Sequence, residues 1–262
     1  SFDTPKNIKE MACKSLNKGN TYYKPTTGEY ALKEKICQKL KRDNNIQTST
    51  ENIIVTPSGK FAVFLALLAV LGEGDKLLLL DPYWVSYEPI AKIAGARVIK
   101  IATSKEKGFQ PDVEAIENSI DNSVKAILVN SPCNPTGSVY DRSKLRAISE
   151  IADKYGALII SDEAYEHLIY EGKHYSPASD FDNVITANSF SKGYAMTGWR
   201  LGYAVASKEI VEGMIKLQQH SVSCVPGFVQ AGGITALTSE ESQLARERMV
   251  ASYKERREII LD

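Results

Sequence analysis

Short apolar segments alternate along this chain with amphipathic ones, and this alternation restricts the possible folds more than any other feature. Five of the segments are nearly continuous apolar runs, as expected for strands that helices cover on both faces. Helical patterns lie between them, and several end at a glycine, the usual helix stop. The order predicts right-handed strand–helix–strand units and a mostly parallel sheet. The strands are expected at 52–56, 76–81, 96–101, 124–130 and 157–162, and the helices at 59–72, 85–95, 111–120 and 141–156.

Two further strands are expected at 183–188 and 201–206. Only residues 189–200 separate them, with no evident helical pattern, which favours an antiparallel final strand. Helical patterns follow at 207–220 and 226–238, and a long charged helix begins near 239. The predicted fold class is therefore α/β, with a mostly parallel seven-stranded sheet and helices on both of its faces.

Charge and composition exclude several classes of function. Lys and Arg together number 32, as do Asp and Glu, so net charge gives no reason to expect nucleic acid or an anionic membrane as partner. The longest apolar run, 61–71, is about half the roughly 20 residues that span a bilayer. The 4 cysteines form no CxxC pair and there are only 3 histidines, which argues against a zinc site and favours reduced thiols in a cytosolic protein.

Ligands of an open parallel sheet bind beyond the carboxyl ends of its strands, so the residues that follow each strand are the candidates for a site. Ser58, Gly59 and Lys60 follow the first strand at a predicted helix start, where free N–H groups and the helix dipole attract anions. The aromatic residues Tyr83 and Trp84 follow the second strand. The other strand ends contribute Asn134, Asp162, Tyr165, Ser189 and Lys192, and Arg200 precedes the last strand.

Each of these features has a simpler interpretation when taken alone. The segment PSGK can be a plain turn with a helix cap, Asp162 can cap the following helix, and Lys192 can be a surface lysine. The aromatic pair can belong to the core, and NPTG is a good turn sequence. Their convergence on one edge of one sheet instead favours a flat aromatic cofactor that carries a phosphate and an aldehyde.

Three segments, SFSKGYAMTGWRLGY, NSPCNPTG and SDEAYEHLIY, resemble the signature segments of class I/II aminotransferases of fold type I, near the aspartate aminotransferase branch. The resemblance extends from about residue 2 to the end of the chain. It joins N-P-T-G, then D-E-x-Y 28 residues later, then S-x-S-K-x(7)-R. It implies a transaminase that moves an amino group between an amino acid and a 2-oxo acid with pyridoxal 5′-phosphate (PLP) as cofactor.

The resemblance also implies roles for these residues. Lys192 matches the lysine that links covalently to the cofactor and then moves a proton between the substrate Cα and the cofactor C4′. Asp162 matches the carboxylate that keeps the pyridine nitrogen protonated. Tyr165 and Asn134 match the pair that binds the ring O3′, and Trp84 matches the aromatic residue that stacks on the ring.

The phosphate-binding residues of the family are matched by Ser58, Gly59, Lys60, Ser189 and Arg200, with Arg200 as the bidentate charge partner. Tyr23 matches a tyrosine that reaches the phosphate in the neighbouring subunit, which implies a homodimer with shared active sites. Lys60 also resembles a lysine that recognises the distal carboxylate of aspartate or glutamate in one subgroup. In the alternative interpretation it serves only the phosphate or the helix start.

The resemblance divides the chain into an N-terminal helical part (1–45), a PLP-binding large domain (46–238) and the start of a helix leading to the small domain (239–262). The sequence begins without a start methionine and stops within a helical pattern, so a longer protein is expected. The family's small domain and a substrate-contacting glycine upstream would then lie outside it. The small domain supplies the arginine that binds the substrate α-carboxylate.

Two other functions are compatible with the same motifs. A carbon–sulfur β-lyase shares the fold and the cofactor lysine, and release of pyruvate and sulfide from cystathionine would identify it. The sensor domain of a transcription regulator can also be built on this core. A sensor needs only to bind its ligand, however, and the complete catalytic set favours the transaminase.

Overall fold

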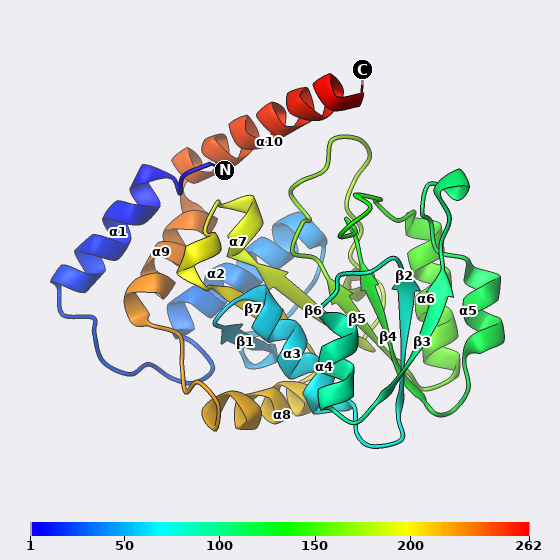
Figure 1. Cartoon of the computed structure of the whole chain (residues 1–262). Coiled ribbons are helices and arrows are strands. Elements are labelled where there is room, and N and C mark those ends of the chain that lie inside the picture. The colour runs from blue at the N-terminus through cyan, green and yellow to red at the C-terminus, as the bar shows by residue number, and fades with distance from the viewer. Residues whose placement is uncertain (1, 262) are drawn as a thin grey trace.

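A seven-stranded sheet forms the centre of the computed structural model, which describes residues 2–261 (Figure 1). The strands lie in the order β1-β7-β6-β5-β4-β2-β3, and only β7 runs antiparallel to its neighbours. This confirms the predicted α/β class and the antiparallel last strand. The strands are β1 (Ile53–Thr56), β2 (Lys76–Asp81), β3 (Arg97–Ala102), β4 (Val124–Asn130), β5 (Leu158–Asp162), β6 (Val184–Ser189) and β7 (Gly202–Val205).

Helices cover both faces of the sheet (Figure 1). One face is covered by α3 (Gly59–Val70), α4 (Tyr87–Ile93) and α8 (Lys208–Gln219). The other is covered by α5 (Val113–Ser119) and α6 (Arg142–Lys154) at one end and by α1 (Lys6–Asn17), α2 (Tyr30–Lys39) and α9 (Gly227–Thr238) at the other. The long helix α10 (Glu240–Leu261) follows α9 and crosses the top of the view.

Burial on both faces explains why the strands read as apolar runs. In β4, Ala126 and Leu128 pack toward α3, whereas Ile127 and Val129 pack toward α6. Alternate residues of a strand point to opposite faces, so a strand between two helical layers needs apolar residues at every position.

The N-terminal part packs against the sheet and is continuous with its core. Ile8 of α1 and Leu32 of α2 share one apolar cluster with Val55 and Tyr203 of the sheet. The boundaries near 45 and 239 remain predictions, and their outer ends, residues 1 and 262, lie outside the described part of the chain. None of the helices in residues 2–261 has the length and apolar character needed to cross a membrane.

The segment between β6 and β7 differs from the sequence expectation. A single helical turn, α7 (Phe190–Gly193), begins at Ser189, whose hydroxyl accepts a hydrogen bond from the Ser191 amide at 3.1 Å. A short 3-10 turn, Thr197–Trp199, follows. Neither turn is long enough to produce a helical repeat in the sequence, so the prediction of no helix was wrong for α7.

Gly202 sits where the backbone allows no side chain. A Cβ at this position would lie 2.3 Å from the Gly59 nitrogen and 2.5 Å from the Ser58 carbonyl carbon. We expect Gly202→Ala to lower the free energy of unfolding by about 2 kcal/mol or more, because the backbone of α3 must move away from β7. Urea unfolding curves measure this effect.

Gly213→Ala is the matched control for that substitution. Gly213 lies in α8, and a Cβ there would have only Ala69 Cβ as a neighbour, at 3.8 Å. Alanine in a helix should stabilise the protein by about 0.5–1 kcal/mol. Equal unfolding midpoints for the two variants would contradict the packing described for Gly202.

Candidate active site

A cavity of about 290 Å³ opens where β4, β5 and β6 end and α3 begins. Ten residues predicted from sequence line it, and they come from six separate segments of the chain. Tyr23 does not line the cavity, and its side chain is 86 % exposed. The ten are Ser58, Gly59, Lys60, Trp84, Asn134, Asp162, Tyr165, Ser189, Lys192 and Arg200.

The start of α3 forms one end of this cavity. Ser58 caps the helix by accepting a hydrogen bond from the Phe61 amide at 3.2 Å. Its φ of 119° is unfavourable for a residue with a side chain, and such strain is concentrated at functional sites. A Cβ on Gly59 would lie 2.8 Å from the Ser189 Cβ, so only glycine lets the two segments approach this closely. The free amides of the first turn are therefore held beside Ser189.

Three cationic side chains line the same cavity. Lys192 is half-buried, with its Nζ 5.6 Å from the centre of the Tyr165 ring. Arg200 is exposed, has a left-handed φ of 56°, and donates to the Thr197 carbonyl oxygen at 2.7 Å. Lys60 lies with its Nζ 5.0 Å from the Trp84 ring centre, as in a cation–π contact. These charges and the start of α3 favour an anionic ligand.

Asp162 contributes a buried carboxylate to the cavity, in contrast to the three cationic side chains. Its side-chain partners within residues 2–261 are both neutral: the Tyr87 hydroxyl donates at 2.7 Å and the Ala164 amide donates at 3.1 Å. Burial raises the pKa of Asp162, and these two hydrogen bonds offset only part of that effect. A ligand group that carries a proton or a positive charge would complete the environment of this carboxylate.

Asn134 and Tyr165 lie side by side on the cavity wall, with the Asn134 Nδ2 3.4 Å from the Tyr165 hydroxyl. Burial, and then the nearby Asp162, raise the pKa of Tyr165, which keeps its hydroxyl protonated and able to donate. Asn130 supports this wall, because its Oδ1 accepts from the Asn134 amide at 2.7 Å and its Nδ2 donates to the Asp162 carbonyl oxygen at 2.9 Å.

Five residues that line the cavity were not among the predicted site residues: Tyr87, Asn130, Ala164, Ser191 and Thr197. Two of them, Tyr87 and Asn130, hydrogen-bond through their side chains to predicted site residues. Asn130 is the last residue of β4 and the single polar end of an apolar run, so the strand-end rule could have identified it. Tyr87 lies in the first turn of α4 and is fully buried, and its sequence position resembles that of a core aromatic.

The cavity thus has a cationic end, a buried carboxylate and an amine at the centre, and an aromatic wall. The family Aminotransferase class I and II matches residues 1–262. An aspartate/prephenate aminotransferase of Thermus thermophilus is 39% identical over 100% of this chain, which covers 68% of that protein. An aspartate aminotransferase of Pyrococcus horikoshii is 42% identical over 99% of this chain, which covers 67% of it.

The fold agrees with these sequence matches. A solved structure of Thermus thermophilus aspartate aminotransferase with maleate superimposes with a TM-score of 0.98 at 39% identity. The match covers 100% of this chain and 69% of that one. Together, the family match and these relatives show that the chain belongs to the class I and II aminotransferases.

Proposed function

We propose that the cavity binds PLP and that the protein transfers an amino group between aspartate or glutamate and a 2-oxo acid. The observation that carries the proposal is the position of Asp162. Its buried carboxylate has only neutral hydrogen-bond partners among residues 2–261, and it lines the same cavity as Lys192. A protonated pyridine nitrogen is the cationic partner that such a carboxylate lacks. Lys192 supplies the amine that an aldehyde-bearing cofactor requires.

The cationic end of the cavity suits the cofactor phosphate. The phosphate would be held by the first amides of α3, the hydroxyls of Ser58 and Ser189 and the Arg200 guanidinium. Helix N-termini and arginine side chains both bind phosphate oxygens well. The close approach of Gly59 to Ser189 fits a cradle formed from two chain segments.

In this proposal PLP supplies an electron sink that allows the Cα–H bond of an amino acid to break. Asp162 would hold the proton at the pyridine nitrogen. Lys192 would supply the amine that links to the cofactor and the base that moves a proton between Cα and C4′. Tyr165 and Asn134 would bind the ring oxygen O3′, and Trp84 would pack against the ring.

The proposal includes a homodimer in the cytoplasm. Tyr23 is highly exposed and does not line the cavity of its own chain, which fits a residue that completes the site of a second subunit. All four cysteines are free, which fits a reducing compartment.

The choice of aspartate or glutamate rests on the substrates named in the relatives and on Lys60. This lysine is exposed beside Trp84 at the mouth of the cavity, where its charge can pair with a second carboxylate of the substrate.

Removal of the cofactor lysine tests the first part of the proposal. Lys192→Ala should still bind PLP through the phosphate-binding groups, but it should lose the visible absorption of the covalent link and all measurable transamination. In the unmodified protein, borohydride reduction followed by peptide mass spectrometry should place PLP on the peptide that contains Lys192. Normal turnover by Lys192→Ala would exclude this role.

The charge of Asp162 is tested by Asp162→Asn, which keeps the shape of the side chain. Loss of a preorganised charge at a buried site should lower kcat by roughly 10²- to 10³-fold. Single-turnover kinetics with Cα-deuterated aspartate should place the loss in proton abstraction. A rate within about threefold of wild type would leave Asp162 only a structural role in the turn after β5, since an effect that small is under 1 kcal/mol.

Lys60→Ala distinguishes substrate recognition from phosphate binding. If Lys60 pairs with the distal carboxylate, kcat/KM should fall about tenfold or more for aspartate and glutamate and much less for alanine and phenylalanine. Initial rates with the four amino acids at saturating PLP give the comparison. Equal losses on all four would assign Lys60 to the phosphate alone.

A further inference from the structure

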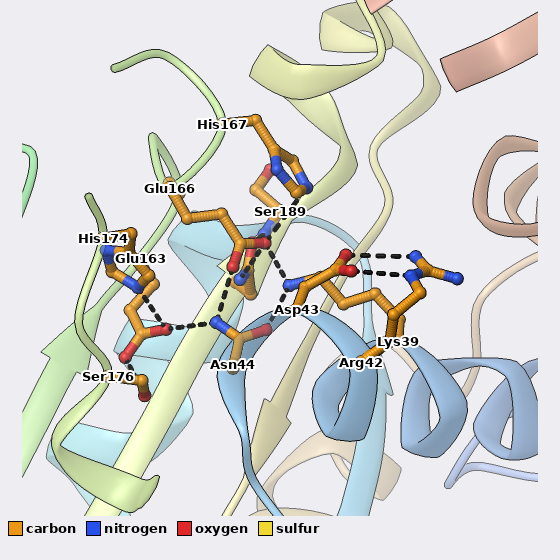
Figure 2. A network of polar contacts seen from close by, with 12 residues as sticks. Lys39, Arg42, Asp43, Asn44, Glu163, Glu166, His167, His174, Ser176 and Ser189 are labelled. Carbon is orange, nitrogen blue, oxygen red and sulfur yellow. Dashed lines mark hydrogen bonds and ion pairs between the residues drawn. The ribbon is translucent and has the colours of Figure 1, made fainter. Parts of the chain in front are cut away.

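A buried polar cluster lies behind the cavity wall. The Glu166 cluster consists of Lys39, Asn44, Glu163, Glu166 and Asn188, all of which are buried. It joins three regions distant in sequence: the end of α2 with the π-helical turn Leu40–Asn44, the segment after β5, and the end of β6. Figure 2 shows Asn44 between the two glutamates, with Lys39 beside Glu166.

Glu166 is the centre of this cluster. Its Oε1 forms an ion pair with the Lys39 ammonium and accepts from the Asn188 Nδ2 at 2.8 Å, and its Oε2 accepts from the Asn44 Nδ2 at 2.8 Å. Burial by itself raises the pKa of Glu166, but the charge and hydrogen bond of Lys39, together with the nearby His167 and His174, outweigh it and hold this pKa well below the usual range. Both oxygens of Glu166 are therefore acceptors held in place by partners from separate segments of the chain.

A metal ion is not needed to explain these carboxylates. Glu163, Glu166 and His174 lie within 4.8 Å of one another, as metal ligands could. However, both Glu163 oxygens already accept hydrogen bonds, from Ser161 and Ser176 on one side and from Asn44 and His174 on the other. The Lys39 ammonium supplies the positive charge beside Glu166. The carboxylate oxygens of Glu163 and Glu166 are therefore satisfied by protein groups.

Three members of the cluster, Glu163, Glu166 and Asn188, are sequence neighbours of residues that line the cavity. Glu166 follows Tyr165, and Asn188 precedes Ser189. Asn188 joins the two segments, because its Nδ2 donates to Glu166 while its Oδ1 accepts from the Ser189 amide at 2.7 Å. A continuous path of hydrogen bonds thus connects the Tyr165 segment to the turn that carries Ser189 and Lys192.

We propose that Glu166 is a positioning residue, which fixes the Ser189–Lys192 turn against the Tyr165 segment through Asn188 and is itself held by Lys39 and Asn44. The consequence for PLP rests on the function proposed above, whereas the link between the two segments does not. Ser189 would contact the phosphate of the cofactor and Lys192 its aldehyde carbon, so a small shift of this turn would disturb both contacts.

The first test compares Asn188→Ala with Glu163→Gln. Asn188→Ala removes both bonds of the bridge without leaving a charge unpaired. Glu163→Gln disturbs the same cluster with the same burial but leaves the Glu166–Asn188–Ser189 path intact. Four quantities are measured for both variants: hydrogen–deuterium exchange without PLP, the thermal unfolding midpoint, the PLP dissociation constant and the pH midpoint of the visible band.

For Asn188→Ala we expect amide exchange in 189–196 to rise about tenfold as the turn opens more often. PLP binding should weaken about tenfold, and the pH midpoint of the visible band should shift because Lys192 has moved. Glu163→Gln should lower the unfolding midpoint and yet keep exchange in 189–196 and PLP affinity within about twofold of wild type.

A second variant removes Glu166 without leaving a buried charge. Lys39→Met/Glu166→Leu replaces the ion pair by apolar side chains of similar size, a change that proteins often tolerate. It should reproduce the exchange and affinity changes of Asn188→Ala. Addition of Asn188→Ala to it should have little further effect, since residues of one path are not additive.

Two results would overturn the proposal. One is exchange in 189–196 and PLP affinity unchanged within about twofold in Asn188→Ala. The other is a Glu163→Gln variant that has the same unfolding midpoint as Asn188→Ala and loses as much exchange protection in 189–196 and as much PLP affinity. The cluster would then act only through global stability. A wild-type protein that takes up no PLP would refute the proposed function, while exchange in 189–196 would still decide whether Glu166 positions the turn.

Discussion

The pairing of Gly202 with two strands at once is the constraint on which the site depends. Gly202 lies opposite Thr56 of β1 on one side and Ser189 of β6 on the other. Because β7 is antiparallel, its first residue meets the last residues of both neighbours. The helix start at Ser58, the turn at Ser189 and the guanidinium of Arg200 are thereby brought to one edge. The remaining groups, on β4 and β5, reach this edge because those strands are parallel to β6.

The fold and most of the candidate site could be predicted from the sequence, because both depend on local patterns. Apolar runs reveal strands buried on two faces, and polar residues just beyond each run mark the edge where a ligand binds. Local patterns could not predict the features that depend on contacts between distant segments of the chain. Nothing local indicates that β7 inserts between β1 and β6 or that Tyr87 bonds to Asp162. Lys39 and Glu166 lie 127 positions apart, and neither gives a sign in the sequence of its partner.

Positive and negative side chains of the site differ in how deeply they are buried. Lys60 and Arg200 are exposed at the mouth, where they attract anions, whereas Asp162 lies in the interior, where burial raises its pKa. The carboxylates of Glu163 and Glu166 lie behind the wall, and the Lys39 ammonium faces Glu166 there. Unpaired acidic groups close to the cationic end of the cavity would weaken its attraction for an anion. Pairing Glu166 with Lys39 limits that weakening and leaves the cationic mouth effective.

The position of β7 also has a consequence for the order in which the protein folds. Successive strands from β2 to β5 are joined through one α-helix each, but β1 and β7 come from opposite ends of the sheet-forming sequence. Closing so long a loop costs entropy that only the completed sheet repays, so this pairing is expected among the last steps. The cradle of Ser58, Ser189 and Arg200 exists only after that step. A ligand that contacts all three of these residues therefore binds only the fully folded protein, and its binding shifts the folding equilibrium toward the folded state.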